Sequence, residues 1–342
     1  MHGLGDLLKS GWKPKRSILI GSWDAEEQGL IGSTEWGEQH AAELANADAY
    51  FNMDVAVSGP KFGASAVPSL KQFVRDLTKA VPSPKGGTVY DQWSKANQPA
   101  AQVVTPSEAI GDSSRLPQAQ VNKDVPVGDL GSGSDYTVFL QRLGVPSTDV
   151  SCSGPYGVYH SVFDNYNWFT KFADPNFVYE QQMARIYGLE LLRMADADVL
   201  PYDYQEYGKE ISAYIDAARK KAETKFPGKV PDFAAATNAA THLTNAGAAM
   251  LKKQNNSSSD AARLNQALRQ TERALLIPEG LPNRRWYRHA IYAPGVYTGY
   301  AAVVIPGVNE AIDAGDLERT RQQIAALAAA INRAAAVLES VR

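Results

Sequence analysis

RSILIGSWDAEEQGLIGSTEW, residues 16–36, sets the fold class of this chain. Its apolar part, Ser17 to Trp23, follows a proline and two basic residues, and short apolar runs of this kind are typical of buried parallel strands. Asp24, Glu26 and Glu27 come directly after it. We therefore expect a strand whose carboxyl end carries several acidic side chains.

The same alternation continues through the first 200 residues. Ala49 to Asn52 and Val145 to Val150 are two more short runs typical of strands. Residues 82–126 are polar and predict an irregular excursion over the surface. Because strands alternate with helices, we expect an α/β fold with a partial parallel or mixed sheet. Helices are predicted at Ser33–Leu44, Pro68–Ala80, Ser134–Leu143 and Asn176–Ala195.

A second, all-α domain is predicted after residue 200. Alanine-rich helical stretches are followed by a non-helical insert at 277–307 and by a long final helix. We therefore expect a domain at 1–200 and a helical bundle at 201–342. The final helix carries a near-heptad stripe, which favours a homodimer through 201–342, although the stripe could instead pack within the chain. The stripe consists of Ile324, Leu327, Ile331, Ala334 and Leu338.

Composition excludes several classes of protein. The 342 residues carry a net charge of −3, which gives no basic face for nucleic acid. The single cysteine, Cys152, excludes an intramolecular disulfide framework and a cysteine-rich zinc module. No stretch reaches the roughly 18 apolar residues of a membrane span, and the first residues lack the pattern of a signal peptide.

The chain opens on what looks like the tail of an amphipathic helix, with Leu4, Leu7 and Leu8 at helical spacing. We therefore expect it to be the C-terminal part of a larger protein. The chain as given is expected to be soluble, and the location of the parent, secreted or membrane-anchored, stays open.

Acidic and imidazole side chains follow all three predicted strands. Glu26 and Glu27 come after the first, Asp54 after the second and His160 in the loop after the third. In open parallel sheets, ligands bind beyond the carboxyl ends of the strands, and this donor mixture suits zinc. A metal would relieve the repulsion between adjacent carboxylates and leave Glu26 free to accept a proton. The alternatives are a solvated acidic turn, an ordinary turn aspartate and a surface histidine.

Five segments resemble, in order, the glutamate carboxypeptidase II and transferrin receptor superfamily of zinc exopeptidases. Residues 16–36 are similar to the segment with the catalytic glutamate, and YFNMD at 50–54 to a strand ending in a zinc-binding aspartate. LGSGSDYTVFLQRLGVPS at 130–147 and GVYHSVFDNY at 157–166 resemble the segment ending in a zinc-binding histidine. PNRRWYRHAIYAPGVYTGYAAVVIPG at 282–307 and the bundle resemble the family's dimerisation domain. The resemblance covers nearly the whole chain.

The resemblance implies a metal centre with two zinc ions. Glu26 matches the general acid/base, Glu27 and His160 match ligands of one zinc, and Asp54 matches a ligand of the other. The family site also uses a histidine and a bridging aspartate from a region before the segments matched here. We therefore expect the zinc site of this chain to be incomplete.

The resemblance also implies a substrate-binding set. Tyr159 matches a tyrosine that hydrogen-bonds the developing oxyanion, and Ser134 and Tyr300 match positions that contact the substrate. The basic residues that capture a glutamate in the family correspond here to Gly299, Asp149 and Ser151. Carboxylate capture needs Arg or Lys.

The function implied is therefore a zinc-dependent exopeptidase that removes terminal residues from small apolar or mixed peptides, with no strict preference for glutamate. The alternative is a non-catalytic dimerisation or binding module of the transferrin receptor kind, in which the fold is kept and the catalytic activity is lost.

Overall fold

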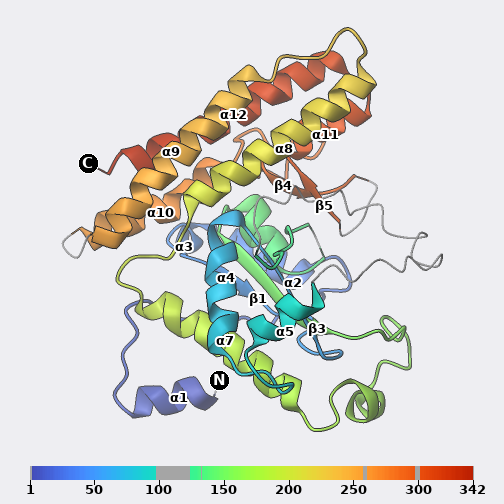
Figure 1. The fold of residues 1–342 in the computed structure, drawn as a ribbon, viewed down its shortest axis with the longest axis vertical. Helices are drawn as coiled ribbons and strands as arrows, with labels where there is room; N and C mark the ends of the chain where they lie inside the picture. Colours follow the sequence, from blue (N-terminus) through green and yellow to red (C-terminus); the bar gives the residue numbers. More distant parts are fainter. Residues whose placement is uncertain (1, 98–123, 132, 257–259, 297–300, 342) are drawn as a thin grey trace.

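The computed structural model describes residues 2–97, 124–131, 133–256, 260–296 and 301–341. An α/β part built around a small sheet is followed by a bundle of long helices (Figure 1). Among the described residues, no helix has both the length and the apolar character that a membrane crossing requires.

Among the residues that the structure describes, the main sheet has three strands in the order β1-β3-β2. β1 (Tyr50–Asn52) runs parallel to the central strand β3 (Ser147–Ser153), and β2 (Lys61–Ala66) runs antiparallel to it. The sheet is therefore mixed, as the sequence indicated. β3 starts two residues later than predicted and extends to Ser153. In KFGASA, the sequence of β2, the apolar residues Phe62, Ala64 and Ala66 alternate with Lys61, Gly63 and Ser65, but two of the three are small alanines, and this strand was not anticipated.

Helices pack around this sheet. α4 (Pro68–Ala80) has the predicted bounds, and α7 (Val178–Asp196) lies close to those expected. α4 buries Leu70 and Leu77 completely, because its apolar residues share one face. The shorter helical elements of this part are α1 (His2–Lys9), α2 (Ile31–Gln39), α3 (Ala41–Leu44), α5 (Val89–Ala96), η2 (Val138–Arg142), α6 (Tyr166–Trp168) and η3 (Phe169–Ala173).

The predicted strand at Ser17–Trp23 is wrong. This segment forms no strand, and its backbone makes no ladder hydrogen bonds to any described residue. Leu19 and Ile20 are 62% and 49% exposed. An apolar run becomes a strand only when a neighbouring strand pairs with it. The end of the run is anchored to β1, where the indole Nε1 of Trp23 donates to the hydroxyl of Tyr50 at 3.0 Å.

Three other predictions need correction, two of helices and one of an irregular region. α2 begins at Ile31, after Leu30 in a left-handed conformation, and not at a Ser33 cap. The helix expected from Ser134 begins at Tyr136, after a bend and a turn, and most of it is the π-helical element η2. The excursion at 82–126 contains the regular helix α5, which begins with a capping box between Thr88 and Asp91. Residues 98–123 of that excursion lie outside the described part.

The bundle consists of α8 (Tyr204–Lys225), α9 (Ala234–Asn256), α10 (Ala261–Ala274) and α12 (Leu317–Glu339). The insert before α12 holds a hairpin of β4 (Tyr292–Pro294) and β5 (Ala302–Val304), followed by α11 (Pro306–Asp313). The near-heptad stripe of α12 is buried within this one chain, where α12 packs on α9 and α10. The stripe therefore gives no evidence for a second copy.

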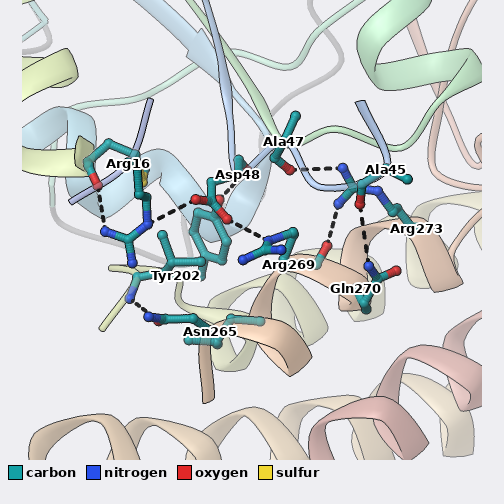
Figure 2. A network of polar contacts seen from close by, with 12 residues as sticks. Arg16, Ala45, Ala47, Asp48, Tyr202, Asn265, Arg269, Gln270 and Arg273 are labelled. Carbon is teal, nitrogen blue, oxygen red and sulfur yellow. Dashed lines mark hydrogen bonds and ion pairs between the residues drawn. The ribbon is translucent and has the colours of Figure 1, made fainter. Parts of the chain in front are cut away.

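Two polar networks join the α/β part to the bundle. In the first, the ammonium of Lys71 on α4 lies 2.9 Å from the carboxylate of Asp129 and 2.6 Å from that of Glu210 on α8. In the second, Asp48 lies between the guanidinium groups of Arg16 and Arg269, at 2.9 and 2.7 Å (Figure 2). Both networks are largely buried, so they fix the bundle against the elements that carry the candidate site.

Candidate active site

The loop that carries Glu26 and Glu27 is a tight turn. Ala25 has a φ of 51°, in the left-handed region, and the carbonyl of Glu26 accepts the backbone N–H groups of Gly29 and Leu30 at 2.9 and 2.8 Å. At Gly32 a Cβ atom would lie 2.5 Å from the carbonyl oxygen of Asp24, so only glycine fits. Backbone sterics therefore set the direction of both carboxylates.

Glu27 and His160 are in contact. The Oε1 atom of Glu27 lies 3.3 Å from Nε2 of His160, although the two come from distant parts of the sequence. His160 has a φ of 56°, and its ring stacks on Tyr159 with a centroid distance of 3.8 Å. Strained backbone of this kind persists where the surroundings require it, often at functional sites. Both side chains of the pair remain accessible, as metal or substrate binding would require.

Further carboxylates surround Glu26. Burial raises the pKa of Glu26, and the charges of Asp54, Asp135 and Glu27 raise it further, while His160 lowers it. Burial also raises the pKa of Asp135, which a hydrogen bond from Ser33 lowers in part. Sequence reasoning missed Asp135, although it directly follows Ser134 in the motif GSGSD. The charges of Asp54 and Asp135 therefore act on Glu26, the neighbour of the Glu27–His160 pair.

Ser134 belongs to a second set of polar groups at the same end of the sheet. The side-chain amide of Asn52 donates to the hydroxyl of Ser134 at 2.9 Å and to Oδ1 of Asp149 at 3.0 Å. Asn52 and Asp149 are register partners on β1 and β3. Tyr300, the other predicted substrate-binding residue, lies outside the described residues.

The donor chemistry suits zinc, but the described residues do not complete a site. Carboxylate oxygen and imidazole nitrogen are ordinary zinc ligands, and a zinc site uses three or four protein ligands. Within the described ranges no group of three or more His, Cys, Asp and Glu side chains is placed to hold a metal. The structure thus brings two of the three predicted ligands, Glu27 and His160, into contact, and further ligands are needed.

Surface hollows elsewhere do not compete as locations for this chemistry. One lies beside α5 and the turn before it, and another lies at the start of α9. Neither contains a candidate catalytic, metal-binding or substrate-binding residue.

Comparison with known proteins identifies the class. Residues 3–174 match peptidase family M28, and residues 224–339 match the transferrin receptor-like dimerisation domain. The M28 match covers half of the chain, so the chain belongs to peptidase family M28. Together the two matches place it in the glutamate carboxypeptidase II and transferrin receptor superfamily, as the sequence motifs indicated.

Named relatives agree with this placement. The chain is 38% identical over 351 residues to a probable glutamate carboxypeptidase of Arthroderma benhamiae, covering 98% of this chain and 45% of the relative. It is 35% identical over 349 residues to a probable glutamate carboxypeptidase of Arabidopsis thaliana, covering 98% and 47%. It is 31% identical over 312 residues to an aminopeptidase of Mus musculus, covering 85% and 39%. The chain therefore spans less than half the length of these relatives.

Proposed function

We propose that this chain forms part of a zinc-dependent exopeptidase that hydrolyses terminal residues of small peptides. The observation that carries the proposal is the 3.3 Å contact between Glu27 and His160, next to the acidic side chains of Glu26 and Asp54. In this proposal Glu27 and His160 hold one zinc and Asp54 contributes to a second. The M28 match and the relatives named as peptidases support it.

Each remaining residue has a distinct role in this proposal. Bound zinc would supply Lewis acidity at the peptide carbonyl and acidify a water molecule. Glu26 accepts a proton at its carboxylate and returns it to the leaving amine, because its partly buried, acidic surroundings favour the protonated form. Tyr159 would orient the substrate carbonyl through its hydroxyl, and Ser134 would contact the substrate.

A second candidate is a non-catalytic module of the transferrin receptor kind. It is favoured by the finding that the described residues contain no three-ligand group. The two candidates differ in peptide hydrolysis. The enzyme hydrolyses peptides and needs zinc to do so, whereas the binding module hydrolyses no peptide.

Glu26→Gln separates the two candidates. In the purified full-length protein with zinc, we expect this change to lower kcat for dipeptide hydrolysis by about 10²–10⁴-fold, because the proton acceptor is lost. Zinc content should stay unchanged. Glu35→Gln, at an exposed position on α2, is the control and should keep full activity. An unchanged kcat in Glu26→Gln would refute the assigned role, and a wild type that cleaves no peptide would favour the binding module.

The transferrin receptor-like domain at 224–339 supports a further proposal, that the protein forms a homodimer through residues 201–342. Light scattering at micromolar concentration should then give twice the mass of one chain. A mass of one chain under these conditions contradicts the dimer.

A further inference from the structure

We propose that Asp149 makes the substrate side of this site select a peptide that carries the positively charged side chain of Lys or Arg. This inference rests on the proposed peptidase function and names the substrate class for that same site. It differs from a glutamate-selecting site in the sign of the charge that is recognised.

The position and orientation of Asp149 are fixed by its neighbours. It lies on the central strand β3, opposite Asn52 of β1 and Ser65 of β2. Asn52 uses its two amide hydrogens on Ser134 and on Oδ1 of Asp149. The second oxygen of Asp149, Oδ2, has no hydrogen-bond partner among the described residues. One oxygen thus anchors the side chain while the other is left for a donor.

The surrounding charge lacks a compensating cation. Within the described part of the chain, no Lys or Arg forms an ion pair with Glu26, Asp54, Asp135 or Asp149. Asp135 is only 9% exposed, and its Oδ1 atom has no partner there. Buried carboxylate oxygens without partners are costly, so this cluster points to positively charged ligands.

Zinc does not account for Asp149. The proposed metal ligands are Glu27, Asp54 and His160, and Asp149 lies outside that set. Burial raises the pKa of Asp149, and the charge of Asp54 raises it further. A substrate ammonium or guanidinium group beside Oδ2 would offset both effects and would form a charge-assisted hydrogen bond. Asp149 is therefore available to select the substrate.

The test compares the affinities of two dipeptides, Lys-Ala and Glu-Ala, for the zinc-loaded full-length protein by calorimetry. We expect the wild type to bind Lys-Ala at least tenfold more tightly than Glu-Ala. Asp149→Asn keeps the shape and the contact with Asn52, and it should remove most of this preference. Asp164→Asn, at an exposed position in the loop after His160, is the control and should keep the preference. N-acetyl-Lys-Ala lacks the α-ammonium group and should still bind, because the lysine side chain is the recognised cation; loss of its binding would overturn the inference.

Several outcomes would overturn the inference. These are equal affinity of the wild type for the two dipeptides, no binding of either, or the same ratio in Asp149→Asn as in the wild type. Because binding is measured without turnover, the two proposals can fail separately. A protein that prefers Lys-Ala through Asp149 but cleaves nothing supports this inference and refutes the peptidase. A protein that cleaves both dipeptides with no preference refutes only this inference.

Discussion

Glu190 on α7 is a fully buried carboxyl group next to the sheet. Burial raises its pKa to about 8, a hydrogen bond from Thr148 lowers it in part, and the charge of Asp149 raises it. The hydroxyl of Thr148 donates to Oε1 at 3.2 Å, while Oε2 has no partner among the described residues. The folded protein therefore holds a proton on Glu190 at a pH where the unfolded chain has lost it.

This proton gives the stability a defined pH dependence. Between the unfolded pKa near 4.5 and the folded pKa of about 8, the folded state binds more protons, so the free energy of unfolding falls as pH rises. Glu190→Gln has no proton to lose at this position, so its free energy of unfolding should not show this fall. The difference in free energy of unfolding between Glu190→Gln and wild type should therefore grow in favour of the variant from pH 5 to pH 8, by at most about 1.4 kcal/mol per pH unit. Urea unfolding at both pH values measures it. Glu223→Gln, at an exposed position on α8, is the control. A Glu190→Gln difference that does not change with pH would contradict the assignment.

At the scale of elements, the crossing of α8 and α9 depends on two glycines. A Cβ at Gly247 of α9 would lie 2.4 Å from the carbonyl carbon of Tyr204, and one at Gly208 of α8 would lie 2.6 Å from the backbone nitrogen of Thr244. The two helix backbones therefore approach each other more closely than side chains would permit.

Gly247→Ala should lower the free energy of unfolding by about 1–3 kcal/mol, because the helices must separate to admit the methyl group. Gly188 of α7 provides a matched control, since a Cβ there meets no atom within 4 Å. Gly188→Ala should instead raise stability by about 0.5–1 kcal/mol through helix propensity. Denaturant unfolding of both variants tests whether α8 and α9 approach this closely. Equal changes in the free energy of unfolding for the two variants would contradict the close approach.

Elements with strong local signals could be predicted from the sequence. α4 was predicted with its bounds, because proline starts it and its apolar residues share one face. The strand at Ser17–Trp23 was wrong, because strand formation depends on a partner that local sequence does not reveal. β2 was missed although its apolar residues alternate, because the two alanines and the glycine of KFGASA give only a weak strand signal.

The same limit applies to the candidate site. The carboxyl-end rule predicted that Glu27 and His160 could converge, and the structure brings them into contact. The rule does not explain this contact, because the segment before Glu27 forms no strand. Their role as zinc ligands stays a prediction. Asp135 and the hydrogen bond from Asn52 to Asp149 could not be derived from spacing, because they depend on how β1, β3 and η2 pack together.

At the scale of the whole molecule, Asp48 joins the α/β part to the bundle. Its carboxylate contacts Arg16 and Arg269, and all three side chains are mostly buried (Figure 2). Arg273 of α10 reinforces the joint by donating to the backbone carbonyls of Leu44 and Ala47, both at 2.8 Å.

Asp48→Ala should therefore lower the free energy of unfolding by about 3–5 kcal/mol, because two largely buried guanidinium groups lose their carboxylate partner. Asp216→Ala is the control, since its pair with Arg219 on α8 is exposed, and it should cost less than about 0.5 kcal/mol. Thermal and urea unfolding of the two variants measure the difference. Similar values for both would show that Asp48 does not hold the two parts together.

The most direct test of the proposed site is where zinc binds. A crystal of the zinc-loaded protein, measured at the zinc absorption edge, should show an anomalous peak about 2.0–2.2 Å from both a Glu27 oxygen and the His160 imidazole. His160→Ala should remove or displace that peak. A zinc ion bound elsewhere, or no zinc peak while Glu27 and His160 remain in contact, would contradict the metallopeptidase account.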